Sequence, residues 1–261
     1  MDYDEAIAPF ELGEGSKYVL ALHGFTGIPY EMRGLSRHLA SKGFHIIGPK
    51  LPGHGEDKGS LLKHADWQEW WGEIERTIDE IKARSPSHLF VTGLSMGGLF
   101  TLYTASRVPE IDAIAPICAP VFVKQKLLTL LPIVKLLRVK YFPMTVEEDI
   151  QDKSWLEDPV VIERMKRYDK TVVRAIDTLL KLMKETKSSL QLIKQPILIS
   201  QSRKDKVIHP SNAPYIFENV RSEEKAILWL ENSGHVATED HDKEQLYTEI
   251  TRFFSEHCKG K

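Results

Sequence analysis

The sequence is poor in several features that mark specialised classes of protein. It has 2 cysteines in 261 residues, Cys118 and Cys258, which is too few for the disulfide framework of a small secreted protein. It has no C-x-x-C pair, no H-E-x-x-H motif and no Cys/His cluster, so we expect no metal site. It also lacks repeats, low-complexity tracts and linkers between domains. After these exclusions, we expect an ordinary globular protein of a reducing compartment.

The sequence also lacks a strong charge imbalance and long apolar runs. With 35 basic and 37 acidic residues the net charge is -2, which does not favour nucleic acid as a partner. No run of about 18 apolar residues predicts a membrane span. Residues 1–5, M-D-Y-D-E, are acidic and lack the basic and apolar regions of a signal peptide. We therefore expect a cytoplasmic protein.

Short apolar runs alternate with amphipathic helices along most of the chain. Such alternation with short loops predicts an α/β fold with a mostly parallel central sheet flanked by helices. The predicted strands cover residues 18–22, 44–47, 89–92, 113–118, 196–200 and 226–230. The predicted helices cover residues 30–41, 67–83, 99–107, 211–218 and 242–254.

This alternation stops between residues 120 and 195, where no convincing strand is found. We predict a core made of residues 1–119 and 196–261, with residues 120–195 inserted as a helical cap. Residues 160–187 show one or two amphipathic helices. Residues 121–146 are rich in leucine and contain five basic residues and no acid. This segment is interpreted either as a mobile lid that touches lipid surfaces or as a packed helix whose lysines are solvated.

One serine lies where a strand meets a helix. Residues 93–97 read G-L-S-M-G, with Ser95 between a predicted strand and a predicted helix. This is the pattern of a nucleophile elbow, in which glycine leaves room for a sharp, strained turn. The pattern predicts Ser95 as a nucleophile, provided that the chain supplies a base, an acid and an oxyanion hole.

Two further strand ends supply a base and an acid. Asp205 follows the strand at 196–200, and His235 follows the strand at 226–230 in the run S-G-H. A serine hydroxyl needs an imidazole to take its proton, and that imidazole needs a carboxylate to orient it. The order Ser, Asp, His is that of the α/β-hydrolase fold. The acids at 239, 240 and 242 lie too close to His235 in the sequence to come from a separate strand end.

The other histidines are weaker candidates for the base. His54 lies in a glycine-rich loop, where we expect a structural role, and His209 is a candidate for the rim of the pocket. The remaining histidines lie on predicted helices, at strand starts or at the start of the last helix.

A tetrahedral intermediate also needs two backbone N–H donors for its oxyanion. The residue after the nucleophile, Met96, is one candidate. The loop H-G-F-T-G at residues 23–27 follows the first predicted strand, and Phe25 is the candidate there.

Four motifs together resemble one known family. Residues 23–27 (H-G-F-T-G), 53–55 (G-H-G), 93–98 (G-L-S-M-G-G) and 233–236 (S-G-H-V) are similar to those of bacterial carboxylesterases and monoacylglycerol lipases of the α/β-hydrolase fold. The resemblance covers nearly the whole chain and is weakest between about residues 121 and 160. It implies the triad Ser95, Asp205 and His235, with Phe25 and Met96 as oxyanion donors. It also implies that cap residue Glu163 helps to hold the glycerol moiety, that short- to medium-chain esters are cleaved, and that no cofactor is needed.

The sequence thus predicts a serine ester hydrolase acting on a small ester such as a monoacylglycerol, without a nucleic-acid partner. Fold alone does not fix function. Amidases, peptidases and acyltransferases use the same triad, and a non-catalytic binding protein on this fold remains a third reading.

Overall fold

A seven-stranded sheet forms the centre of the protein. The computed structural model describes residues 1–123, 140–142, 151–168 and 170–258. In those residues the strand order is β1-β3-β2-β4-β5-β8-β9, and every neighbouring pair is parallel except β1 with β3. The mostly parallel sheet that the sequence predicts is thereby confirmed. The strands are β1 (Phe10–Leu12), β2 (Lys17–Leu22), β3 (His45–Gly48), β4 (His88–Leu94), β5 (Ala113–Ile117), β8 (Ile197–Ser202) and β9 (Lys225–Leu230).

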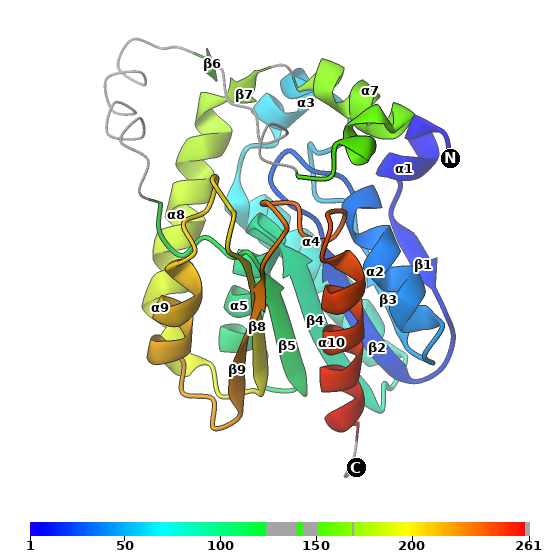
Figure 1. Ribbon diagram of the computed structural model, residues 1–261, viewed down its shortest axis with the longest axis vertical. Helices are drawn as coiled ribbons and strands as arrows, with labels where there is room; N and C mark the ends of the chain where they lie inside the picture. The colour runs from blue at the N-terminus through cyan, green and yellow to red at the C-terminus, as the bar shows by residue number, and fades with distance from the viewer. Residues whose placement is uncertain (124–139, 143–150, 169, 259–261) are drawn as a thin grey trace.

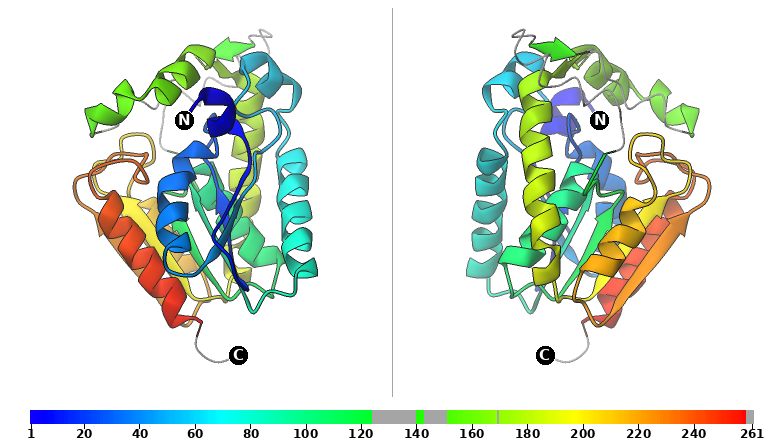
Figure 2. Two further views of the ribbon diagram at one scale, coloured as in Figure 1. Left: turned by 90° about the vertical axis from the view of Figure 1, so that its right-hand side faces the viewer. Right: turned by 90° about the vertical axis from the view of Figure 1, so that its left-hand side faces the viewer.

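Helices cover both faces of this sheet (Figures 1 and 2). One apolar cluster packs under α4, α5, α8 and α9, and the other packs under α2 and α10. The smaller helices α1, α3 and α7 lie towards the end of the molecule where the strands have their carboxyl ends (Figure 1). The helices are α1 (Tyr3–Ile7), α2 (Tyr30–Ala40), α3 (Lys58–Lys63), α4 (Trp67–Ala83), α5 (Met96–Arg107), α7 (Pro159–Arg167), α8 (Val173–Ser189), α9 (Asn212–Asn219) and α10 (Lys243–Glu256).

Strand β2 shows why an apolar run without alternation forms a central strand. Successive side chains of a strand point to opposite faces. Tyr18, Leu20 and Leu22 join one cluster, whereas Val19 and Ala21 join the other. Both faces of the strand are covered, so a polar residue at any of these positions would lose contact with water. Burying a large apolar side chain stabilises the fold by roughly 1.5–3 kcal/mol.

Two features of the sequence explain helix α4, namely an N-cap residue at its start and apolar residues at helical spacing. Asp66 is its N-cap, and the carboxylate accepts a hydrogen bond from the N–H of Gln68, which satisfies one of the free donors of the first turn. Buried residues at helical spacing, Trp70, Ile74 and Ile78 among them, face the sheet. The predicted bounds of residues 67–83 agree with the structure.

The segment between β5 and β8 contains a pair of strands that the sequence analysis did not predict. We found no strand in it from the sequence, but β6 (Tyr141–Phe142) and β7 (Thr171–Val172) pair antiparallel. Two-residue strands contain too few residues to show a period of two. Two amphipathic helices are confirmed as α7 and α8, and the 3-10 turns η3 (Lys153–Glu157) and η4 (Leu190–Leu192) flank them. Most of the leucine-rich basic stretch predicted at 121–146 lies outside the described residues.

Helix α8 belongs to the helical layer as well as to this insertion. It packs along α5 and α4, and the N–H of Trp67 at the start of α4 donates to Thr178 Oγ1 at 2.9 Å. The division of the chain into a core and a cap at residues 120 and 195 therefore stays a prediction. Across the residues that the structure describes, no helix combines the length and the hydrophobicity needed to cross a bilayer.

Candidate active site

The turn after β4 has the strained geometry of a nucleophile elbow. Ser95 lies between Leu94, the last residue of β4, and Met96, the first of α5. Its φ of 56° and ψ of -111° lie outside the regions that L-residues favour. A side chain at Gly97 would meet the carbonyl oxygen of Leu22 at 2.1 Å. Glycine is therefore required there, as the spacing of the motif predicts.

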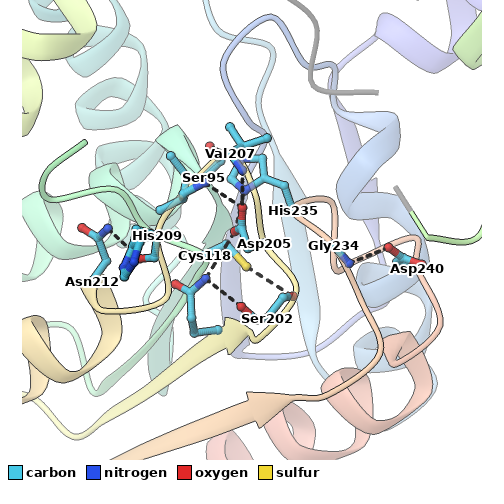
Figure 3. A network of polar contacts seen from close by, with 12 residues as sticks. Ser95, Cys118, Ser202, Asp205, Val207, His209, Asn212, Gly234, His235 and Asp240 are labelled. Atoms are coloured by element: carbon cyan, nitrogen blue, oxygen red, sulfur yellow. Dashed lines mark hydrogen bonds and ion pairs between the residues drawn. The ribbon is translucent and has the colours of Figure 1, made fainter. Parts of the chain in front are cut away.

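The structure brings Ser95, His235 and Asp205 together, although 140 residues separate the first two (Figure 3). His235 Nε2 lies 2.9 Å from Ser95 Oγ, and His235 Nδ1 lies 2.9 Å from Asp205 Oδ2. With the proton on Nδ1, His235 donates to Asp205 and accepts from the serine hydroxyl. His235 and Asp205 are buried, whereas Ser95 is partly exposed, so a substrate can reach the serine.

The Asp205 carboxylate is held by the loop after β8. Its Oδ1 accepts the N–H groups of Val207 and Ile208 at 3.0 and 2.7 Å, and its Oδ2 accepts from Gln201 Nε2 at 3.2 Å as well as from His235. These hydrogen bonds hold the carboxylate in place. The group that orients His235 is thus fixed in position before any substrate binds.

Cys118 lies beside this triad, and its chemistry argues against a metal site. Cys118, Asp205 and His235 form the one group of three potential ligands that the described residues bring together. Burial, and next the Asp205 charge, raise the pKa of the Cys118 thiol, whereas metal binding requires the thiolate. The Nδ1 atom of His235 already contacts Asp205. The three side chains therefore suit proton transfer better than a cation, and Cys118 is a buried thiol as predicted.

The loop after β2 brings Phe25 to the nucleophile. Phe25 lines the same pocket as Ser95, and a Cβ atom on the preceding Gly24 would lie 3.7 Å from Ser95 Cβ. His23 fixes the start of this loop, with Nδ1 2.9 Å from the Gly24 carbonyl oxygen and Nε2 accepting from the N–H of Leu51 at 3.1 Å. Burial lowers the pKa of His23 to about 4, so at neutral pH the ring is neutral and makes both hydrogen bonds.

Met96 is the first residue of α5 and is fully buried. The first N–H groups of a helix have no partner within the helix, and the helix dipole is positive at this end. The backbone of Met96 thus offers a donor next to Ser95.

A largely apolar pocket opens above Ser95 and His235. Helix α8 forms one wall with Ile176, Leu179, Leu180 and Met183. The loop after β8, the segment after β5 and the loop after β2 form the others. Its charged members are Glu31 and Arg164. An apolar cleft with few polar groups is typical of a site for a small apolar ligand.

The cap residue predicted to bind glycerol, Glu163, lies elsewhere. It is on α7, where its carboxylate accepts from Arg167 Nε at 2.9 Å, and its side chain is 36% exposed. Among the described residues that line the pocket is its neighbour Arg164, and not Glu163. Successive helical residues point about 100° apart, so Arg164 lines the pocket while its neighbour Glu163 does not. A contact between Glu163 and glycerol stays a prediction.

Two buried carboxylates after His235, which we had set aside as triad acids, hold the loop that carries it. Asp240 is fully buried and accepts hydrogen bonds from four backbone N–H groups at 2.7–3.0 Å. Figure 3 shows the bond from Gly234. These donors are Gln151, Asp152, Gly234 and His241. Asp242 accepts from Asn232 and Ser233 in the same way. A pair of acids close behind a strand-end histidine is the signal that would have indicated this role.

The structure confirms the prediction for His54 and differs from the prediction for His209. His54 is fully buried, with its ring centroid 5.2 Å from that of Trp70 and 5.0 Å from that of His23, which confirms a packing role. His209 was the candidate for the pocket rim. It instead contacts Ser211 at the start of α9 through Nδ1 at 2.7 Å, and Val207 and Ile208 from the same loop line the pocket.

The sheet, the elbow after β4 and the Ser-His-Asp arrangement define a serine hydrolase of the α/β-hydrolase fold. A family model described as serine aminopeptidase, S33, matches residues 13–242, and the chain belongs to this family.

Named relatives agree with this class. The chain is 36% identical over 250 residues to a thermostable monoacylglycerol lipase of Bacillus sp. strain H-257, covering 96% of this chain and 95% of that one. It is 30% identical over 246 residues to a carboxylesterase of Bacillus subtilis strain 168, covering 94% and 95%. A solved structure of the metagenome-derived lipolytic enzymes LipS and LipT is similar with a TM-score of 0.85 and 32% identity, covering 97% and 98%.

Proposed function

We propose that this protein is a serine carboxylic ester hydrolase that cleaves monoacylglycerols or similar esters with short to medium acyl chains. The observation that carries this proposal is the Ser95–His235–Asp205 chain of two 2.9 Å contacts at the wall of an apolar pocket. The relatives named as a monoacylglycerol lipase and a carboxylesterase support it.

The geometry indicates the usual two-step reaction of such a triad. Ser95 Oγ attacks the ester carbonyl carbon while His235 Nε2 takes the hydroxyl proton. The N–H groups of Phe25 and Met96 stabilise the oxyanion. When the tetrahedral intermediate collapses, His235 gives its proton to the departing alcohol and the acyl group stays on Ser95. Water then attacks the acyl-enzyme with His235 as base, and the carboxylic acid leaves. No cofactor takes part.

The family description raises aminopeptidase activity as an alternative. An aminopeptidase must bind the positively charged amino terminus of its substrate, and Glu31 is the carboxylate that lines the described pocket beside the triad. Arg164 lies 3.5 Å from Glu31 and neutralises it. The pocket wall is otherwise largely apolar, which favours an acyl chain over a charged amino group.

Replacement of the nucleophile tests the mechanism. We expect Ser95→Ala to lower kcat on p-nitrophenyl esters by at least about 10⁴-fold, with an unchanged circular dichroism spectrum. A fluorophosphonate probe should label the wild type at Ser95 and leave the variant unlabelled. Near wild-type activity in Ser95→Ala would contradict the mechanism. Parallel assays with monoacylglycerols and aminoacyl anilides separate the esterase from the aminopeptidase.

Two further parts of the proposal rest on the sequence. The free cysteines support a cytoplasmic location. The basic, leucine-rich stretch of the cap supports transient contact with a lipid surface, for which co-sedimentation with anionic vesicles is the assay.

A further inference from the structure

The two residues on either side of Phe25 contact the same buried ion pair. The N–H of Gly24 donates to Glu31 Oε2 at 3.3 Å, and the carbonyl oxygen of Thr26 accepts from Arg164 Nη1 at 3.5 Å. Glu31 and Arg164 are themselves 3.5 Å apart. The backbone segment that holds the Phe25 N–H is thus bracketed on both sides by one pair of charges.

The loop is folded tightly around the Glu31 carboxylate. A turn closes it, with the N–H of Gly27 donating to the Gly24 carbonyl oxygen at 3.1 Å. Thr26 adopts a φ of 56°, which costs conformational energy in a residue with a side chain. A Cβ atom on Gly27 would lie 2.1 Å from Glu31 Oε2. The backbone therefore rests directly against the carboxylate, and a shift of Glu31 would shift the loop.

The partner charge comes from the inserted segment. Arg164 lies on α7, 133 residues along the chain from Glu31 (164 minus 31). Its side chain is 2% exposed and that of Glu31 is 5% exposed. The guanidinium also lies 5.7 Å from the centre of the Trp155 ring in η3. Water screens so buried a pair only weakly, so loss of one partner costs more than loss of one member of an exposed pair.

We propose that the Glu31–Arg164 ion pair is a positioning device for the oxyanion hole, through which the placement of α7 sets the geometry of the Phe25 N–H. The proposal rests on the proposed function, because it takes Phe25 as an oxyanion donor. Both residues line the pocket, so the competing role is direct contact with the alcohol part of the substrate. The two roles predict different effects of losing the ion pair. If the pair positions the oxyanion hole, the rate falls by the same factor for every ester. If it contacts the substrate, the loss depends on the alcohol part of the ester.

The experiment uses Arg164→Met, Glu31→Gln and the double variant with esters that share one acyl group and differ in alcohol, from methyl to glycerol. We expect Arg164→Met to lower kcat/KM by about tenfold to a hundredfold, mainly through kcat, because displacing an oxyanion donor costs less than the hundredfold or more of removing one. The factor should be the same for every alcohol. The affinity for a trifluoromethyl ketone with the same acyl group should fall by a similar factor, because its adduct with Ser95 carries an oxyanion. The double variant should lose less than the product of the single losses.

Two further variants keep the test sharp. Lys166→Met removes a cation from the exposed side of the same helix, where the side chain is 71% exposed, and should retain wild-type kinetics. Arg164→Lys keeps the charge and should recover part of the lost kcat, even if Arg164→Met folds poorly. Fluorophosphonate titration counts the active sites, so that kcat refers to folded protein.

Loss of activity that grows from the methyl to the glycerol ester, or an unchanged affinity for the ketone, would overturn the positioning role. Those results leave the triad mechanism intact. By contrast, a wild type that the fluorophosphonate fails to label, or an active Ser95→Ala variant, defeats the proposed function itself. The two failures are therefore distinguishable.

Discussion

At the scale of single residues, the site depends on a histidine that stays uncharged. His23 is buried and uses both ring nitrogens to hold the oxyanion loop to the loop after β3. Burial lowers its pKa from 6.5 to about 4. Below pH 6.5 the unfolded chain therefore binds a proton that the folded protein does not bind. The stability that this neutral ring confers is complete above pH 6.5 and is lost as the pH falls towards 4.

We accordingly expect the free energy of unfolding to fall by about 3 kcal/mol between pH 7 and pH 4 through His23 alone. Urea unfolding followed by tryptophan fluorescence at several pH values measures this slope. His23→Asn should flatten the slope by close to one proton, although it lowers stability at pH 7. The exposed His241 provides the control, and His241→Asn should keep the wild-type slope. A wild-type slope in His23→Asn would show that the ring does not carry this dependence.

Sequence patterns could identify the residues that react but not most of those that hold them. Ser95, Asp205 and His235 each follow a strand, and parallel strands end at one edge of the sheet, so their convergence is predictable. Glu31 and Arg164 lie within amphipathic helices, where a charged residue usually faces solvent. Nothing local distinguishes Arg164 from Glu163. Only the packing of α7 against the oxyanion loop shows which of them is buried.

At the scale of elements, the loop between β9 and α10 ties the catalytic histidine to the insertion. The Asp240 carboxylate binds the N–H of Gly234, next to His235, and the N–H groups of Gln151 and Asp152 just before η3. One side chain thus sets the distance between two loops that lie far apart in the sequence. Movement of either loop would disturb the alignment of His235 with Ser95.

Asp240→Asn should remove two of the four hydrogen bonds that this side chain accepts. An amide has one accepting oxygen, so two of the four N–H donors would face an NH₂ group instead. We expect the free energy of unfolding to fall by about 2–4 kcal/mol and kcat/KM to fall with it. Chemical denaturation and steady-state kinetics measure the two effects. Glu244→Gln, an exposed change at the start of α10, should alter neither. Unchanged stability in Asp240→Asn would contradict the role assigned to this carboxylate.

Long helices and strands could be predicted from the sequence, whereas the shortest ones could not. Long amphipathic helices such as α4 and the buried parallel strands show clear periods or apolar runs. The antiparallel edge strand β1 and the short helix α1 escaped notice, because three to five residues contain less than two turns of helix or two alternations of a strand. The pair β6–β7 escaped for the same reason.

At the scale of the whole molecule, the pocket lies between the carboxyl edge of the sheet and helix α8. The elbow and the loops after β2, β5 and β8 line it together with α8, which makes an apolar wall. Leu180 on this wall is only partly buried, which fits a side chain that faces an open cleft. The size of this wall residue should therefore set the acyl chains that fit.

We expect Leu180→Trp to shift the preference towards shorter chains and Leu180→Ala towards longer ones. One methylene in an apolar pocket changes kcat/KM by about tenfold to two-hundredfold, so the ratio of butanoate to decanoate hydrolysis should change at least tenfold in opposite directions. Rates for p-nitrophenyl esters of graded chain length give this ratio. Leu192→Trp, at an exposed site on η4, is the matched control. Parallel shifts in both Leu180 variants would place the acyl chain elsewhere.

The position of the insertion within the sheet has a consequence for biosynthesis. Strands β2 to β5 and Ser95 leave the ribosome first, whereas Asp205 and His235 follow 110 and 140 residues after the serine. Domains generally fold as units. Because the acid and the base come last, Ser95 has no group to take its proton until nearly the whole sequence has been translated.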